Sequence, residues 1–93
     1  MKWVFHWYNE NLAIANELIS LDCYLSFGRS LLHPNGKNAE IFRALPLERI
    51  FLETDDADVS IENIYAKAAE LKDISIENLK KSIIANYQFV FLK

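Results

Sequence analysis

Cysteine, glycine, proline and clustered basic residues are scarce in this 93-residue sequence, and each shortage excludes a class of protein. The single cysteine, Cys23, cannot form an internal disulfide, so the chain is not a small disulfide-stapled fold. Two glycines and two prolines are too few for a fibrous or low-complexity chain. The formal net charge is −3 and no Lys/Arg run occurs, so the sequence has no electrostatic footprint for nucleic acid or an anionic membrane.

Long apolar stretches are also missing. No segment approaches the roughly 20 apolar residues of a membrane-spanning helix, and the first apolar run is too short for the core of a signal peptide. The sequence therefore predicts a cytoplasmic protein. Hydrophobic residues make up 52% of the chain, which suffices for one modest core and for a single unit covering residues 1–93.

Three short apolar runs predict β-strands. They are residues 3–8, residues 24–27 with a possible start at Cys23, and residues 50–52, which end at Glu53. Their apolar residues are continuous instead of alternating, which is typical of strands covered on both faces in a parallel sheet.

Helical patterns follow each run. Asn9 or Asn11 caps the first helix, and the "HPNG" turn at 33–36 precedes a shorter one that Pro46 ends. Ser60 and Ser75, each in the word "SIEN", cap two more helices. The residues expected to face inward are Leu12, Ala15 and Ile19, broadened by Ile14, Leu18 and Leu21; Ile41, Phe42 and Leu45; Ile61, Ile64, Tyr65, Ala68 and Leu71; and Ile76, Leu79, Ile83 and Tyr87.

The predicted order is βαβαβαα, an α/β arrangement of three (βα) units with an extra carboxyl-terminal helix. Right-handed crossovers would place all three strand carboxyl ends at one edge of the sheet. That edge would carry His6, the segment 26–30 and Asp55. Ligands of α/β sheets bind at this edge, so we expect the functional residues there.

The stretch "FLETDDADVS" contains four carboxylates, Glu53, Asp55, Asp56 and Asp58, just after the third strand. Asp55 is the leading candidate for a cation ligand or for activating water on a metal. The alternative is that these acids only solvate a loop and help to cap the next helix. Glu53 lies so close to the strand that we expect it to be partly buried and to need a polar partner.

His6 also has two interpretations, a hydrogen-bonded core histidine or a metal ligand at a strand end. His33 belongs to a turn and is expected to be exposed. "SFGRS" has one glycine and one cation, Arg29, which is not the pattern of a phosphate-binding loop or of a nucleophile elbow.

Taken in order, "VFHWY", "DCYLSFGRSLL", "ALPLERIFLETD" and "ANYQFVF" resemble the carboxyl-terminal part of the TatD family of metal-dependent hydrolases, over essentially the whole chain. These are (β/α)₈-barrel enzymes, many of them described as deoxyribonucleases. The resemblance implies that the chain corresponds to the last third of a TIM barrel, since such a barrel needs about 250 residues.

The resemblance also implies roles for individual residues. His6 and Asp55 would bind a divalent cation (Zn²⁺, Mg²⁺ or Mn²⁺), Asp55 would help to activate the attacking water, and Glu53 and Thr54 would support them. The family's His-x-His pair, its mid-barrel Glu and a further His have no counterpart in these residues. We therefore expect weak or no metal binding and no useful turnover by this chain alone.

A three-stranded piece of a barrel would also expose two sheet edges and an apolar face. The expected partner is a second copy of the chain or the amino-terminal portion of the barrel, with DNA or another phosphoester as substrate by resemblance only. The competing hypothesis is a non-catalytic α/β module that acts by self-association or by binding a partner.

Overall fold

A computed structural model describes residues 3–6, 8, 11–32, 36–53 and 60–91 of the chain. It has an α/β fold in which three parallel strands lie in the order β1-β2-β3, as the sequence predicts. The elements are β1 (Trp3–Phe5), α1 (Leu12–Ser20), β2 (Cys23–Phe27), η1 (Arg29–Leu32), α2 (Lys37–Ala44), η2 (Leu47–Arg49), β3 (Ile50–Leu52), α3 (Ile61–Lys72) and α4 (Ile76–Phe91).

The middle strand, β2, is the centre of the core. All five of its residues are buried, and it pairs with β1 on one side and β3 on the other. The expectation of a strand covered on both faces is therefore confirmed for β2. It is wrong for β1, which is shorter than expected and leaves Trp3 60% and Phe5 41% exposed. Trp3 and Phe5 lie on the same face of β1, whereas the helices that pack most on the sheet contact β2 (α1) and β3 (α4).

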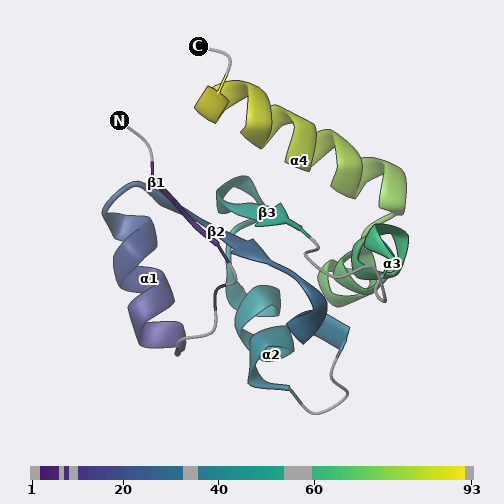
Figure 1. Cartoon of the computed structure of the whole chain (residues 1–93), viewed down its shortest axis with the longest axis horizontal. Helices are drawn as coiled ribbons and strands as arrows, with labels where there is room; N and C mark the ends of the chain where they lie inside the picture. The colour runs from purple at the N-terminus through teal and green to yellow at the C-terminus, as the bar shows by residue number, and fades with distance from the viewer. Residues whose placement is uncertain (1–2, 7, 9–10, 33–35, 54–59, 92–93) are drawn as a thin grey trace.

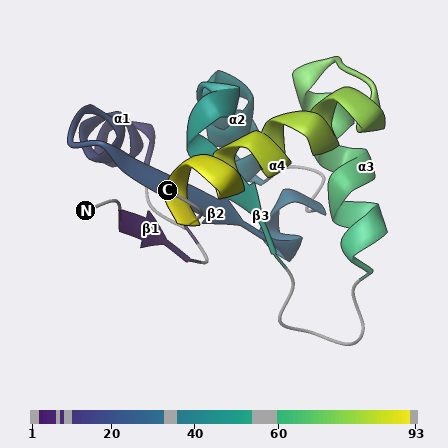
Figure 2. The ribbon, with the colours of Figure 1, turned by 90° about the horizontal axis from the view of Figure 1, so that it is seen from above.

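Helices cover both faces of the sheet. The ring of Phe27 on β2 lies 5.2 Å from Phe42 of α2, and the ring of Phe51 on β3 lies 6.1 Å from Phe91 of α4. Phe27 pairs with Leu52, the residue after Phe51, so Phe27 and Phe51 point to opposite faces. Figure 1 shows the consequence, with α4 on one side of the sheet and α2 on the other, and Figure 2 shows α4 lying across the strands.

Three helix starts follow the capping chemistry expected from the sequence. The Asn11 Oδ1 accepts a hydrogen bond from the Ile14 N–H at 2.8 Å. Ser60 Oγ accepts one from the Glu62 N–H at 3.1 Å, and Ser75 Oγ accepts one from the Asn78 N–H at 3.1 Å. Each bond satisfies a backbone donor that has no partner inside its own helix.

Most of the residues expected to face inward are buried. The confirmed ones are Ala15, Ile41, Phe42, Leu45, Ile64, Ala68, Leu71, Leu79 and Ile83. Leu12, Ile14, Leu21, Ile76 and Tyr87 are instead exposed, Leu21 by 65% and Tyr87 by 50%. At the level of Tyr87, the residue that turns inward is Asn86, whose Nδ2 donates to the carbonyls of Leu47 at 3.0 Å and Ile50 at 2.8 Å.

A polar contact joins the turn after α1 to the start of β3. Asp22 adopts a left-handed backbone conformation (φ 67°), which Asp tolerates better than most residues. Its carboxylate accepts a hydrogen bond from the Arg49 guanidinium at 2.5 Å, which raises the pKa of Arg49, and the same guanidinium lies 5.2 Å from the ring centroid of Tyr24. Within the described part of the chain, no helix combines the length and apolarity needed to cross a membrane.

Candidate functional site

The carboxyl ends of the three parallel strands meet at one edge of the sheet, as expected. His6 is the residue after β1, and Glu53 is the residue after β3. The end of β2 holds the backbone near both: the Tyr8 N–H donates to the Ser26 carbonyl at 3.0 Å, and the Glu53 N–H donates to the Phe27 carbonyl at 2.9 Å. The backbone bonds that extend the sheet therefore also fix the positions from which His6 and Glu53 project.

The side chains of His6 and Glu53 meet across the end of β2. The His6 Nδ1 lies 2.7 Å from the Glu53 Oε1, although 47 positions separate the two residues. The Glu53 side chain is only 18% exposed, so the expectation that it is partly buried and has a polar partner is confirmed. The His6 side chain is 64% exposed, so the interpretation of His6 as a core histidine is wrong.

This contact determines which nitrogen of the His6 imidazole is available to a ligand. An ionised carboxylate only accepts hydrogen bonds, so a neutral His6 ring that bonds to Glu53 carries its proton on Nδ1. The lone pair is then on Nε2. A carboxylate that binds one ring nitrogen while the other is left to a metal is the usual outer support of a metal-ligating histidine. His6 Nε2 is therefore one donor that suits a divalent cation at this edge.

The structure brings together only part of the predicted site. Asp55 and Thr54 lie outside the described residues, as do Asp56, Asp58 and His33. In the ranges that are described, no group of three or more His, Cys, Asp or Glu side chains is placed to hold a metal ion. The placed part of the site is thus one candidate ligand, His6, with the carboxylate that orients it.

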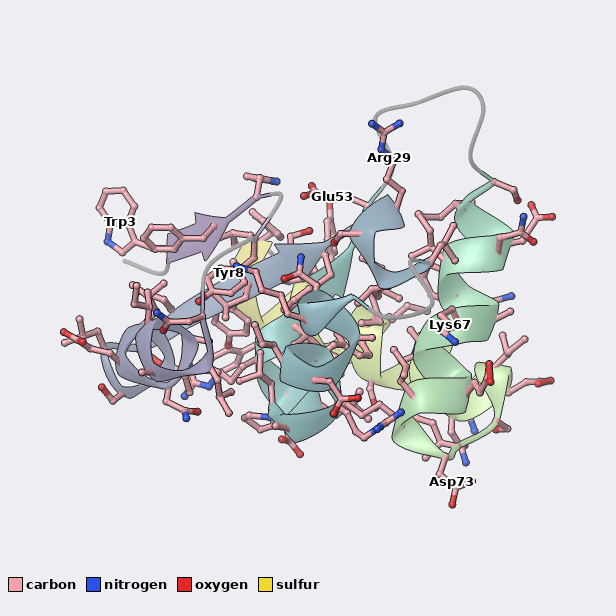
Figure 3. All side chains as sticks on the ribbon, turned by 90° about the horizontal axis from the view of Figure 1, so that it is seen from below. Trp3, Tyr8, Arg29, Glu53, Lys67 and Asp73 are labelled. Atoms are coloured by element: carbon pink, nitrogen blue, oxygen red, sulfur yellow. The ribbon has the colours of Figure 1, made fainter. Side chains whose placement is uncertain are left out.

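Arg29 stands at the same edge of the sheet. It follows the end of β2, and Figure 3 shows its guanidinium and Glu53 on the side of the sheet where the connection from β3 to α3 begins. The sequence argument set Arg29 aside because a single cation makes no phosphate-binding loop. The predicted strand order already placed the segment 26–30 at this edge, and in the folded chain Arg29 contributes a positive charge near the strand end that carries Glu53.

Asn38 is a residue that the sequence argument missed. It is the second residue of α2 and is only 3% exposed, and its Nδ2 donates to the Tyr8 carbonyl at 2.9 Å and to Ser30 Oγ at 2.8 Å. Its Oδ1 is buried and has no hydrogen-bond partner among the described residues. The available signal was an asparagine, a poor helix former, in the first turn of a short helix pattern, between Lys37 and Ala39.

Comparison with known proteins identifies the family. A family model described as "TatD related DNase" matches residues 1–92. This chain belongs to the TatD family. The resemblance noted in the sequence is therefore confirmed, whereas a search of curated proteins found no match.

Solved TatD structures have the same fold. The crystal structure of YJJV, a TatD homologue from Escherichia coli K12, has a TM-score of 0.86 with 20% sequence identity and covers 97% of this chain. A TatD-family hydrolase from Entamoeba histolytica has a TM-score of 0.77 with 16% identity and covers 94% of it. This chain spans only 40% and 41% of those two proteins. The prediction of a partial TIM barrel is therefore confirmed.

Proposed function

We propose that this chain is the carboxyl-terminal, metal-binding portion of a TatD-like hydrolase that cleaves phosphodiester bonds. The observation that carries the proposal is the His6–Glu53 contact of 2.7 Å at the carboxyl edge of the sheet. A structural histidine would be buried, whereas the His6 ring is exposed and oriented by a carboxylate. Family membership supports the same conclusion, because the "TatD related DNase" model spans this edge.

Each residue has a defined part in the proposed site. His6 Nε2 would bind the cation, Glu53 would hold the ring and keep its proton on Nδ1, and Asp55 would be a second ligand by family resemblance. A bound divalent cation supplies Lewis acidity toward a phosphoryl oxygen and lowers the pKa of water. Arg29 supplies positive charge at the same edge, where the oxygens of a phosphodiester would lie.

Full coordination needs more donors than His6 and Asp55 provide. Metal sites of this chemistry use four or more ligands, and His6 with Asp55 makes two. We therefore propose that the site is completed by residues of another polypeptide segment, either the amino-terminal part of the barrel or a second copy of the chain. Turnover by the isolated chain is expected to be negligible.

Paramagnetic broadening by Mn²⁺ tests the proposed ligands even when binding is weak. Titrating the ¹⁵N-labelled chain with Mn²⁺ should broaden the His6 and Glu53 signals before those of residues at the opposite edge. His6→Ala and Asp55→Ala should each remove this selectivity. His33→Ala is the matched control, because it deletes the other histidine of the chain and should leave the broadening unchanged. Equal broadening at both edges of the sheet, or selectivity that survives His6→Ala, would contradict the proposal.

A non-catalytic module is the second candidate function, and exposed apolar residues favour it. Trp3 and Phe5 on β1, together with Tyr87 and Phe91 on α4, are each at least 41% exposed. Such residues on a small α/β unit suit self-association or the binding of a partner protein. Metal analysis of the purified protein separates the two candidates, because stoichiometric metal that is lost in both His6→Ala and Asp55→Ala supports only the hydrolase.

A further inference from the structure

We propose that Asn38 is a positioning residue for the His6 site: it anchors the chain just after His6 so that the imidazole meets Glu53. This inference rests on the proposed role of His6. The structural basis is that His6 lies in a turn between two attachment points of the chain. Before it, Phe5 pairs with Leu25 of β2. After it, both the backbone N–H and the carbonyl of Tyr8 are hydrogen-bonded.

The two bonds at Tyr8 come from different elements. Its N–H donates to the Ser26 carbonyl at the end of β2, which continues the sheet. Its carbonyl accepts from Asn38 Nδ2 of α2 at 2.9 Å, which is a contact between residues 30 positions apart. Ser26 and Asn38 thus hold the backbone two residues beyond His6 from two directions, and Tyr8 itself is buried. Figure 3 shows Tyr8 between the strands and the helices.

The orientation of the Asn38 amide follows from the chemistry of its neighbours. A backbone carbonyl only accepts, so the group that faces the Tyr8 carbonyl must be the NH₂. This orientation leaves Oδ1 buried without a partner among the described side chains and backbone. The free-energy cost of burying Asn38 Oδ1 without a partner is about as large as the stabilisation from the two neutral hydrogen bonds that Nδ2 donates. An apolar side chain of the same shape would leave the Tyr8 carbonyl without this donor, so the asparagine is what ties α2 to the backbone beside His6.

Asn86 provides a matched control within the same chain. It too is a buried helical asparagine whose Nδ2 donates to two backbone carbonyls, those of Leu47 and Ile50. Leu47 precedes β3 and Ile50 is its first residue, whereas His6 and Glu53 lie at the opposite, carboxyl ends of the strands. A purely structural role would make Asn38 and Asn86 equivalent. A positioning role makes only Asn38 matter to the His6 ring.

The test is the tautomer of His6, read from its ¹⁵N ring shifts in metal-free protein at a pH where the ring is neutral. The wild-type ring should be protonated on Nδ1. Asn38→Leu should shift it toward the Nε2–H form that an unrestrained histidine favours, whereas Asn86→Leu should keep the Nδ1–H form. Ser30→Ala removes the other Asn38 contact but not the anchor at Tyr8, so it should also keep the Nδ1–H form.

Two outcomes would overturn the proposal: an Nδ1–H ring that persists in Asn38→Leu, or an equal tautomer shift in Asn86→Leu. If Asn38→Leu does not fold, Asn38→Asp replaces it, because an ionised Asp keeps the shape but has no donor. In the wild type, a scalar coupling through the hydrogen bond from Asn38 Nδ2 to the Tyr8 carbonyl carbon is also expected, and its absence would refute the anchor. These measurements need no metal. A negative result would therefore contradict the role of Asn38 without contradicting the metal-binding proposal, which the Mn²⁺ titration tests.

Discussion

At the scale of single residues, a contact between two strand ends turns an ordinary histidine into a candidate metal ligand. The backbone of β2 separates β1 from β3, yet the His6 and Glu53 side chains bridge that distance and meet at 2.7 Å. Because Glu53 is largely buried and its backbone N–H is bonded to β2, the carboxylate is the fixed member of the pair. The exposed His6 ring is the member that it orients.

Glu53→Gln tests this division of roles. The amide has no charge and offers both a donor and an acceptor, so it no longer requires a proton on His6 Nδ1. Loss of an outer carboxylate typically weakens metal binding about 10- to 100-fold. The Mn²⁺ concentration that half-broadens the His6 signals should rise by a similar factor. Glu40→Gln, which changes an exposed acid on α2, should leave that concentration unchanged.

Lys72 is a second residue whose surroundings decide its behaviour. Its Nζ donates to the carbonyls of Arg43 and Leu45 at the end of α2 and lies 5.3 Å from the Phe42 ring centroid. Partial burial lowers the pKa of the ammonium below 10.5, and the nearby Glu48 opposes that shift. Lys72 thus satisfies carbonyls that α2 leaves without an intrahelical partner.

Lys72→Met should lower the free energy of unfolding by about 1–2 kcal/mol, since it keeps the packing but removes the donors. Because the folded state loses its Lys72 proton at a lower pH than the unfolded state, the wild type should gain stability relative to Lys72→Met as pH rises toward 10.5. Urea unfolding at several pH values measures both effects. Lys67→Met on the same helix is the control. If the wild type gained as much stability with pH relative to Lys67→Met as relative to Lys72→Met, this account would be contradicted.

At the scale of elements, short polar signals set the helix starts and tertiary packing sets which helical faces are buried. The serines of the two "SIEN" words cap α3 and α4 as expected, because capping involves only neighbouring residues. Tyr87 has the spacing of an inward residue on α4 but is exposed, since α4 rests on the sheet through Asn86 and Phe91. Sequence periodicity could not show which side of this part of α4 faces the sheet.

The caps allow a direct prediction about the two similar helices. Ser60→Ala and Ser75→Ala each remove a side-chain acceptor at a helix start and should each lower the free energy of unfolding by about 1 kcal/mol. Each serine Oγ accepts its hydrogen bond from a backbone N–H of its own helix. Chemical denaturation should therefore show the loss of stability, while the His6 ring shifts stay at their wild-type values. A change in the His6 tautomer in either variant would show that the site depends on general stability.

At the scale of the whole molecule, the chain has the fold of part of a barrel and leaves apolar surface exposed at its outer strand. Trp3 and Phe5 are exposed on β1, and Phe91 is exposed at the far end of the chain. A domain of this size has little apolar burial to spare, so covering these side chains by association would stabilise it.

We therefore expect the 10.8 kDa chain to self-associate when it is studied alone. Trp3→Lys and Phe5→Lys introduce charge on the exposed side of β1 and should shift sedimentation toward the monomer. Leu21→Lys is the matched control, because Leu21 is 65% exposed but lies in the turn after α1. A wild-type chain that sediments as a single monomeric species at all concentrations would disprove the association.

Local sequence patterns were enough to predict the strand and helix order, the parallel sheet and the family, because these depend on apolar runs, caps and the "PLERIFLETD" block. They also indicated that Glu53 needed a partner. The packing of strands and helices was needed to show that the partner is His6, that Asn38 anchors the chain beside it, and that Trp3 and Phe5 are exposed. The physical reason is that local patterns fix backbone conformation, whereas side-chain contacts between residues 30 to 47 positions apart depend on how strands and helices pack.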